Sequence, residues 1–488
     1  MENNKNLLAK LTVKTDHRLL LPVLSFVKNL AVDFGFGADD ADKLMVVTEE
    51  ACKNVVKHAF KDEPDACFDI IVSKRDGRFV ISIEDKGLPF DFDSEENDKP
   101  KGFGLTIINE YTDEIKFVNL GQNGKRIELI KKFPAQLQES GISGTSSPET
   151  PAPASSAPVT EFEYRLMKSD EYMKLEQLVY KTYGYTYFQF VYFPDKIKEM
   201  IGSGLLLSTI AVTPDGHVAG HAAVEKIHTD SKVAEFGMLM VDPLYRDRHL
   251  GIHLMNNVIS NAREHGILGL FSEAVTIHPY SQKTILDSGG KETGIMLGYI
   301  SKEMSFRKIQ DEQPARQSAV LLYTRLNPEP ERTVYLPREH SAVLKKIYDY
   351  VGIKRLYKKT LLSELNLDEP SAIDISIQQD LNIAHLDIIN FGNDIEKALK
   401  VHLRELLLQK IDVIYLNIFL SNPAAQHFNK TIEALGFIFC GVIPELKEGD
   451  ILRYQYLNNV DLNIESTVIV SDMGKELFDY VIKYNSTN

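Results

Sequence analysis

Tryptophan is absent from this sequence of 488 residues, and cysteine occurs three times, at Cys52, Cys67 and Cys440. An odd number of cysteines without metal-ligand spacing does not indicate a disulfide framework, and it fits a reducing compartment. Long apolar runs are missing too: no segment reaches the roughly 18 apolar residues of a membrane span, and the polar first residues lack the apolar core of a secretory signal. We therefore expect a cytoplasmic chain that does not bind a membrane.

An excess of positive charge is also missing, because 69 acidic residues outnumber 55 basic ones and give a formal net charge of -14. This balance argues against broad nonspecific binding to nucleic acid or to anionic membranes. Small anions and proteins are the expected partners. The 43% hydrophobic content is that of an ordinary globular protein, and a chain of this length should divide into about three domains.

Two polar stretches predict the boundaries between these domains. The stretch from about Pro134 to Thr160 is rich in Pro, Ser and Ala, with almost nothing apolar to bury, and predicts a flexible linker over 136–159. Residues 307–319 predict a second connector. Helix and strand patterns mix within each remaining part, which indicates an α+β fold class. The expected domains cover residues 1–135, 160–306 and 320–488.

A helix with two distinct faces is predicted in the first domain. Its core-facing stripe is formed by apolar residues at helical spacing, Leu44, Val47, Ala51 and Val55. Glu50, Asn54 and His58 follow one another four residues apart and line a neighbouring face. Taken alone, these three polar residues are more typical of a solvated surface.

Two glycine-containing turns follow this helix. The strand Phe79–Glu84 runs into Asp85 and Gly87, where a carboxylate can accept a hydrogen bond from an adenine amino group and the glycine lets the base approach the backbone. Farther on, Gly102-Phe103-Gly104-Leu105 opens a predicted helix, whose free N–H groups and dipole favour phosphate. Each turn alone is weak support for a nucleotide site.

In this order and spacing, the three elements resemble the N box and the two glycine boxes of the GHKL ATPases, closest to their anti-sigma-factor serine kinase branch. The resemblance covers residues 1–133 and implies a Bergerat-type α/β sandwich that binds ATP with Mg²⁺. It implies that Asn54 holds the metal, that Asp85 and Gly87 receive adenine, that Gly102, Gly104 and Leu105 frame the triphosphate, and that Glu50 is the general base. It also implies a protein substrate or an antagonist-like partner, and a dimer through this domain stays open.

A basic turn follows the strand Glu235–Val241 in the second domain and leads into a helix predicted over Ile252–His265. An ordinary surface turn is equally consistent, although a helix N-terminus of this kind offers N–H groups to a pyrophosphate. The segment VDPLYRDRHLGIHLM resembles the acetyl-CoA signature of the GNAT acetyltransferases, and the resemblance spans about 160–306. The residues that it assigns to acetyl-CoA are Val241, Arg246, Arg248, His249, Leu250, Gly251, Ile252 and His253, the last in place of a usual small residue.

Catalysis in this domain requires a base for the acceptor amine, and Glu235 is the candidate. A solvent-facing strand carboxylate is the equally weighted alternative. The tyrosine that often serves the family as acid falls on Ile285, and Tyr280 and His278 are substitutes by proximity alone. The aromatic segment 183–190 lies where these enzymes build the acceptor pocket, although such a run is more often packing.

The third domain resembles the C-terminal half of another GNAT fold, from Leu416 through a helix predicted over Ala424–Leu435 to the strand Ile451–Leu457. No Arg-x-x-Gly-x-Gly turn occurs between Pro314 and Leu416. We expect a degenerate GNAT-like domain that packs firmly on the second one and does not bind acetyl-CoA alone. Two functions stay open: a bifunctional enzyme, serine/threonine protein kinase-like and N-acetyltransferase, or a non-catalytic protein that sequesters a regulatory partner and senses acyl-CoA.

Overall fold

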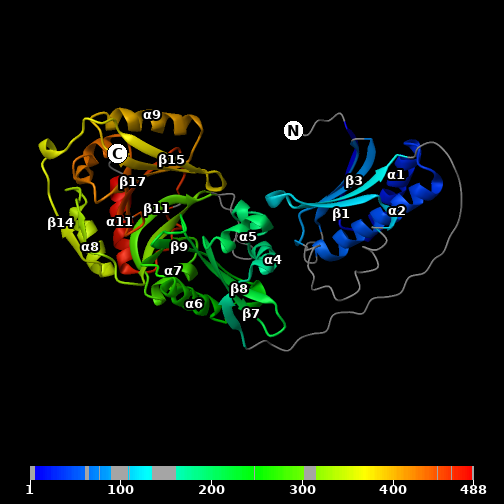
Figure 1. Cartoon of the computed structure of the whole chain (residues 1–488), viewed down its shortest axis with the longest axis horizontal. Helices are drawn as coiled ribbons and strands as arrows, with labels where there is room; N and C mark the ends of the chain where they lie inside the picture. The colour runs from blue at the N-terminus through cyan, green and yellow to red at the C-terminus, as the bar shows by residue number, and fades with distance from the viewer. Residues whose placement is uncertain are drawn as a thin grey trace. The chain divides into compact units, whose positions relative to one another are not determined.

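The computed structural model of the chain divides into two compact units, an N-terminal unit of Met1–Val159 with Gln189–Pro194 and a C-terminal unit of Thr160–Phe188 with Asp195–Asn488 (Figure 1). The structure describes residues 6–60, 65–75, 77–89, 108, 110–133, 161–246, 248–301, 315–447, 449–462 and 464–485. The linker expected over 136–159 and most of the connector expected over 307–319 lie outside these residues. Within them, no helix has both the length and the apolar character needed to cross a bilayer.

The N-terminal unit is one antiparallel sheet with helices on one face. The sheet has the strand order β1-β2-β3-β5-β4. Its strands are β1 (Leu7–Lys14), β2 (Cys67–Arg75), β3 (Arg78–Asp85), β4 (Glu114–Asn119) and β5 (Lys125–Lys132). Helices α1 (Leu20–Asp33) and α2 (Ala38–Asn54) cover it, and a π-helical turn, Val55–Ala59, continues α2.

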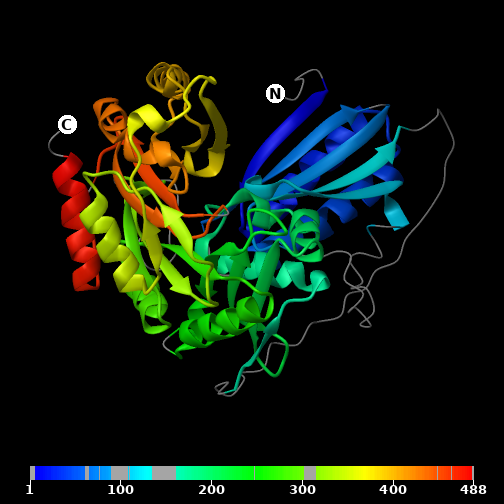
Figure 2. The same cartoon turned by 60° about the vertical axis from the view of Figure 1, so that its left-hand side comes forward.

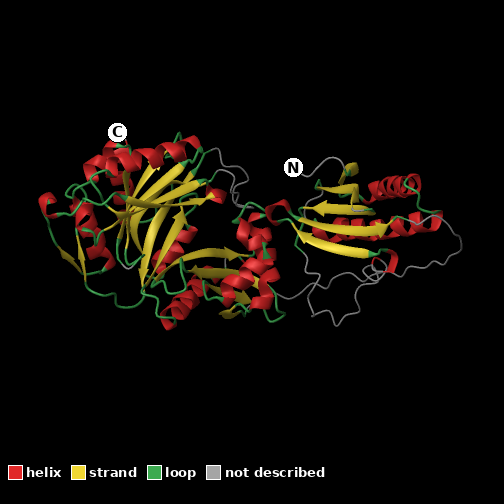
Figure 3. Cartoon of the chain, turned by 45° about the horizontal axis from the view of Figure 1, so that its top comes forward, coloured by secondary structure: helices red, strands yellow, loops and turns green. Residues whose placement is uncertain are grey.

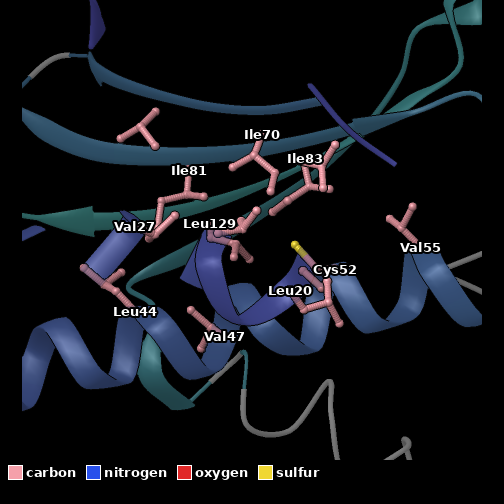
Figure 4. Packing of buried hydrophobic residues seen from close by; sticks show 14 of the residues in the cluster. Leu20, Val27, Leu44, Val47, Cys52, Val55, Ile70, Ile81, Ile83 and Leu129 are labelled. Atoms are coloured by element: carbon pink, nitrogen blue, oxygen red, sulfur yellow. The ribbon is translucent and has the colours of Figure 1, made fainter. Parts of the chain in front are cut away.

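The core of this unit confirms the predicted helix stripe, because Leu44, Val47, Ala51 and Val55 are all buried. Figure 4 shows Leu44 and Val47 pointing from α2 toward Ile81 and Leu129 of the sheet. Each fully buried side chain of this size stabilises the fold by about 1.5–3 kcal/mol. The apolar face of α2 thus fixes where its polar face, with Glu50 and Asn54, is held.

The C-terminal unit contains two halves, and the first half begins at β6. Its strands are β6 (Glu163–Leu166), β7 (Leu206–Val212), β8 (Val218–Glu225), β9 (Val233–Val241), β10 (Gly269–Val275), β11 (Lys291–Ile300) and β12 (Gln317–Arg325). Its helices are α4 (Tyr172–Tyr183), α5 (Pro194–Gly202), α6 (Leu250–Glu264) and α7 (Tyr280–Asp287). The first residue of α5 is grouped with the other unit.

The second half follows from β13 (Arg332–Val334) to the C-terminal helix. Its other strands are β14 (Arg355–Tyr357), β15 (Ala372–Gln378), β16 (Ile383–Asn390), β17 (Val413–Phe419), β18 (Ile438–Ile443) and β19 (Ile451–Leu457). Its helices are α8 (Ser341–Val351), α9 (Ile395–Leu408), α10 (Asn429–Ala434) and α11 (Asp472–Asn485). Helices α8 and α11 lie side by side, where Lys346 donates to Glu476 at 2.6 Å (Figure 2).

Both halves share one sheet of 12 strands, in the order β15-β16-β17-β19-β18-β11-β12-β10-β9-β8-β7-β6 (Figure 3). The halves repeat one pattern, because β12 inserts between β10 and β11 as β19 inserts between β17 and β18. The fixed interface expected between residues 160–306 and 320–488 is therefore confirmed. The limits expected from sequence need correction, since β12 begins within the connector expected over 307–319 and completes the first half.

Glycines join the two halves at the centre of this sheet. Gly294 of β11 pairs with Gly441 of β18, and a Cβ atom on Gly294 would lie 2.5 Å from the carbonyl oxygen of Cys440. Only glycine permits so close an approach of two backbones. Beside this contact, the buried Gln455 side chain accepts from the Leu297 N–H at 2.8 Å and donates to the Ile295 carbonyl at 3.1 Å. A side-chain amide thus continues the sheet where the main chains separate.

Candidate functional site

In the N-terminal unit, Asp85 lies at the end of β3 and is almost completely buried. Its Oδ1 accepts hydrogen bonds from the Gly87 N–H at 2.9 Å and from Lys125 Nζ at 2.5 Å. Gly87 packs directly on Ala59, since a Cβ atom at position 87 would meet that of Ala59 at 2.4 Å. The carboxylate is thus held by a lysine and by the glycine turn, and this rigid setting suits the reading of a ligand amino group.

The polar face of α2 carries the other proposed ATP residues. Glu50 and Asn54 are both half-buried, one turn apart, and Asn54 is the last residue of α2. The amide oxygen of Asn54 is a ligand of the type that Mg²⁺ accepts, and the phosphates of a nucleotide would supply further oxygens. The side chain of His58 and the segment with Gly102, Gly104 and Leu105 lie outside the described residues.

In the C-terminal unit, Asp242 anchors the turn between β9 and α6. Its carboxylate is buried and accepts hydrogen bonds from Lys181 of α4 at 2.9 Å and from the Leu244 N–H at 3.0 Å. It also forms a hydrogen bond with His217 at 3.1 Å. Burial alone would raise the pKa of Asp242, but the bonds from His217, Lys181 and Leu244 outweigh it and lower the pKa well below the usual range. This aspartate, which the sequence analysis does not single out, fixes the start of the turn.

The turn then delivers backbone N–H groups at the first turn of α6. His249 adopts a left-handed conformation with φ of 57°, and α6 begins at Leu250, two residues before the predicted start. Leu250, Gly251 and Ile252 therefore present the N–H groups that no earlier helical carbonyl receives. A Cβ atom on Gly251 would meet nothing closer than Thr284 Oγ1 at 3.7 Å, so the fold itself does not require glycine there.

The basic and flanking side chains surround this helix start. Arg248 is exposed, with its guanidinium 5.6 Å from the ring centroid of Tyr245. Arg246 is half-buried, and its charge opposes the burial that raises the pKa of Tyr183 to about 12. His253 is exposed and lies against Tyr164, with ring centroids 5.5 Å apart, while Val241 ends β9. All eight residues assigned to acetyl-CoA thus belong to the segment from the end of β9 to the first turn of α6.

The strands β9 and β10 separate beside this turn. They pair in parallel over three residues, up to Glu235 opposite Phe271, and make no further pair within the described chain. Beyond that point β9 bulges at Met238, whose φ is 53°, and its register with β8 shifts there. A bulge re-aims the backbone of a strand and terminates its pairing. The result is an opening between two strands directly before the helix N-terminus.

Glu235 lies where the strands begin to separate, and it is half-buried rather than facing bulk solvent. Burial, followed by the charges of Glu273 and Glu225, raises the pKa of Glu235 well above its usual range. Glu273 also has a raised pKa because of burial, opposed by Arg453 and by a hydrogen bond from Tyr299. The sequence analysis finds Glu235 but misses Glu273. A carboxylate within the apolar strand 269–275 is itself a signal, because carboxylates are rarely buried in a strand of this kind.

The proposed acid positions divide between core and surface. Ile285 is 3% exposed and belongs to the core, whereas Tyr280 is 67% exposed at the start of α7. His278 lies between these environments, and burial lowers its pKa. Tyr183 and Tyr187 of the aromatic segment pack together, with ring centroids 4.4 Å apart, and both are buried. Position 285 therefore has no side chain that could donate a proton in place of the family tyrosine.

The equivalent place in the second half is closed. Strands β16 and β17 pair in parallel over six residues, from Ile383 opposite Val413 to Ile388 opposite Ile418. The turn that follows β16 has Gly392 and Asp394 but no arginine before α9 begins at Ile395. This half has neither the strand opening nor the basic turn of the first half.

Comparisons with known families match the two units separately. Residues 13–131 match the histidine kinase-like ATPase domain, and residues 173–282 match the acetyltransferase (GNAT) family. These matches confirm the two resemblances recognised in the sequence.

Individual relatives agree with the family matches. The serine-protein kinase RsbW of Bacillus cereus strain B4264 is 26% identical over 132 residues, which are 24% of this chain and 81% of the relative. RsbW of Bacillus anthracis strain A0248 is also 26% identical over 132 residues, which are 24% of this chain and 81% of the relative.

Among solved structures, the ribosomal-protein-S18-alanine N-acetyltransferase of Escherichia coli is 15% identical, with a TM-score of 0.27, over 35% of this chain and 97% of its own. The phosphinothricin acetyltransferase of Sinorhizobium meliloti, in complex with AcCoA, is 14% identical, with a TM-score of 0.28, over 35% of this chain and 92% of its own.

Proposed function

We propose that this chain, which joins a histidine kinase-like ATPase domain to a GNAT acetyltransferase domain, is an acetyl-CoA-dependent N-acetyltransferase with a second, ATP-dependent phosphoryl-transfer site. One observation carries the proposal: the parallel pairing of β9 and β10 ends at Glu235, and the same strand then continues into the turn before the N-terminus of α6. An acyl donor with a pyrophosphate and an amine acceptor need these two features side by side.

In the proposed acetyl transfer, the N–H groups of Leu250, Gly251 and Ile252 bind the pyrophosphate of acetyl-CoA, and Arg246 and Arg248 add positive charge. Glu235, as a carboxylate, takes one proton from the ammonium of the acceptor. The amine nitrogen then forms its bond to the acetyl carbon, and the carbon–sulfur bond breaks. The nitrogen loses its second proton, the coenzyme A thiolate gains one, and Glu235 passes its proton to solvent.

In the N-terminal unit, the proposed ligand is ATP with Mg²⁺. Asp85 accepts from the adenine amino group, Asn54 contributes an oxygen to the metal, and Glu50 receives the proton of an attacking hydroxyl. Support comes from the fixed position of Asp85 and from the similarity to a serine-protein kinase. Bound Mg²⁺ would neutralise the phosphate charge, which is the main requirement of phosphoryl transfer.

The rival function is a signalling protein that sequesters a regulatory partner through the N-terminal unit and senses acyl-CoA without turnover. The buried Ile285 favours it, because no acid stands at that position to protonate the leaving thiolate.

Calorimetry of the full chain with ATP–Mg²⁺ and with acetyl-CoA, separately and together, tests binding at both sites. Release of the coenzyme A thiol in the presence of a panel of primary amines then separates the two functions. Thiol release that depends on the amine and falls in Glu235→Gln supports the enzyme. Tight acetyl-CoA binding without thiol release from any amine supports the sensor, and failure to bind acetyl-CoA contradicts both.

A further inference from the structure

The first half presents three carboxylates on one face of adjacent strands. Glu225 of β8 is directly opposite Glu235 of β9, which is directly opposite Phe271 of β10. Glu273 follows two residues after Phe271, so its side chain leaves the same face of the strand. Like charges opposite one another are unfavourable, and half-buried ones more so. Such a group needs either protons or a nearby cation.

The cation comes from the other half of the unit. Arg453 of β19 is 4% exposed, and its Nη1 lies 3.6 Å from Glu273 Oε1. No hydrogen bond is formed by this Nη1 in the described structure. Arg453 is thus placed toward a carboxylate that belongs to a strand 180 positions earlier in the chain.

A single row of paired residues connects these two side chains across the sheet. Each residue of the row is directly opposite the next: Glu273, Leu321, Gly294, Gly441, Arg453, Asn417 and Asp387. The third and fourth members, Gly294 and Gly441, are glycines, which carry no side chain. Side chains of directly opposite residues share a face, so the guanidinium can extend over the glycines toward Glu273. The join between the halves therefore creates the space that this contact occupies.

Arg453 is fixed from its own half. Its Nε donates to Asn417 Oδ1 at 2.9 Å, and Asn417 Nδ2 donates to Asp387 Oδ1 at 2.7 Å. The guanidinium also lies 5.2 Å from the ring centroid of Tyr415. The hydrogen bond and the aromatic ring already restrict the guanidinium. Its contact with a neighbouring carboxylate therefore costs little further conformational entropy.

We propose that Arg453 of the second half is a positioning residue for acetyl transfer in the first half, because it keeps the negative charge of the carboxylate pair on Glu273 and leaves the exchangeable proton to Glu235. The inference rests on the proposed acetyltransferase function and deepens it. The ammonium of the acceptor would replace the proton on Glu235 when it binds, after which Glu235 is free to act as the base. The second half thus serves the reaction without a cofactor site of its own.

Other groups also face this pair and enter its titration. They are Glu225 of β8, Tyr299 of β11, His385 of β16, Tyr415 of β17 and Cys440 of β18. Burial raises the pKa values of both tyrosines and of the thiol, and it lowers that of His385. The two tyrosines, the thiol and His385 therefore stay neutral at neutral pH, whereas Glu225 adds a further negative charge, so Arg453 is the neighbouring cation that can hold Glu273 ionised.

Infrared spectroscopy of the full chain in heavy water tests the proposal without a substrate, through the carbonyl band of protonated carboxyl groups. At neutral pH the wild type should show the band of a buried, protonated carboxyl group, and Glu235→Gln should remove this band. Arg453→Met should add a second band, and Arg453→Met with Glu273→Gln should lack it. Asn417→Ala keeps the charge of Arg453 but removes the hydrogen bond that holds its guanidinium, so it should add a weaker second band. Unchanged spectra in both Arg453→Met and Asn417→Ala would overturn the proposal.

Kinetics supply the second readout. The acidic limb of kcat/KM should move to higher pH by about 1–3 units in Arg453→Met, as expected when a carboxyl loses an adjacent cation. A merely structural loss would instead lower kcat at every pH and leave the position of the limb unchanged. If the wild type acetylates no amine, the proposed function fails, and the infrared bands still decide the role of Arg453.

Discussion

The Nδ1–H of His221 donates a hydrogen bond to the carbonyl oxygen of Met238, 3.0 Å away, at the residue where β9 bulges. A carbonyl oxygen can only accept, so this contact assigns the proton to Nδ1. The other ring nitrogen, Nε2, then accepts from Ser208 Oγ at 2.6 Å. The fully buried imidazole is therefore neutral and ties the bulge, and with it the strand opening, to β8 and β7.

This ring should make stability depend on pH. Burial lowers the pKa of His221 to about 4, opposed by the bond to Met238. An unfolded chain has the ordinary pKa of about 6.5, so it gains the proton first as pH falls, and stability is lost between pH 6.5 and 4 by about 3 kcal/mol in total. His221→Asn, whose amide can still donate to Met238, should show a smaller difference between urea midpoints at pH 7 and pH 4.5. His265→Asn, an exposed control, should keep the wild-type difference.

Gly251→Ala should weaken acetyl-CoA binding without loss of stability. The nearest atoms to the added methyl group belong to Thr284, at 3.7 and 3.9 Å, which is ordinary contact distance. The methyl group would instead occupy the space in which a pyrophosphate approaches the backbone. Calorimetry should give a dissociation constant at least tenfold higher, which corresponds to about 1.4 kcal/mol. Gly202→Ala makes the same chemical change in open space and should bind as the wild type does.

Asp85→Asn should weaken ATP binding by roughly 10- to 100-fold, in line with about 1.5–3 kcal/mol for a hydrogen bond to a charged group. The comparison variant is Asp69→Asn, because Asp69 is also a strand carboxylate paired with a lysine, Lys10, at 2.8 Å. It has no proposed contact with nucleotide. Titration with ATP–Mg²⁺ should separate the two variants, and equal affinities would remove Asp85 from the adenine site.

The full chain should bind one acetyl-CoA, not two. In the second half, β16 and β17 remain paired over six residues, so the main-chain groups that an acyl-CoA would need are already bonded to each other. The expected result is a calorimetric stoichiometry near one per chain in the wild type, and no site that keeps the wild-type affinity in Gly251→Ala. A residual site of undiminished affinity in that variant would show that the second half binds the cofactor.

Local patterns predicted what local forces determine. The stripe Leu44, Val47, Ala51 and Val55 follows from helical spacing, and the strand before Asp242 follows from its apolar residues. The helix expected over Ala424–Leu435 is wrong in part, because Asn422 caps a short 3₁₀ turn, Pro423–Gln426, and α10 starts only at Asn429. Side-chain capping of a turn competes with a continuous helix, and helical spacing alone does not reveal it.

Contacts between distant strands were beyond such patterns. The polar residues before Gln317 suggested the end of a domain, yet β12 returns to fill the centre of the sheet. The ion pair of Arg453 with Glu273 depends on the register of five strands and on two glycines that bring them together. No periodicity in the sequence encodes this register, since it is fixed by which edges the folded halves present to each other.

The same glycine contact sets a limit on how the chain can be divided for expression. A fragment that ends after Arg325 would lose Gly441 and the Gln455 amide and would leave the Ile295 carbonyl and the Leu297 N–H of β11 without these partners. A long apolar strand with such an open edge is a template for pairing with other chains. The fragment should therefore form insoluble aggregates on overproduction, whereas a boundary placed after the last residues of α11 keeps that edge covered.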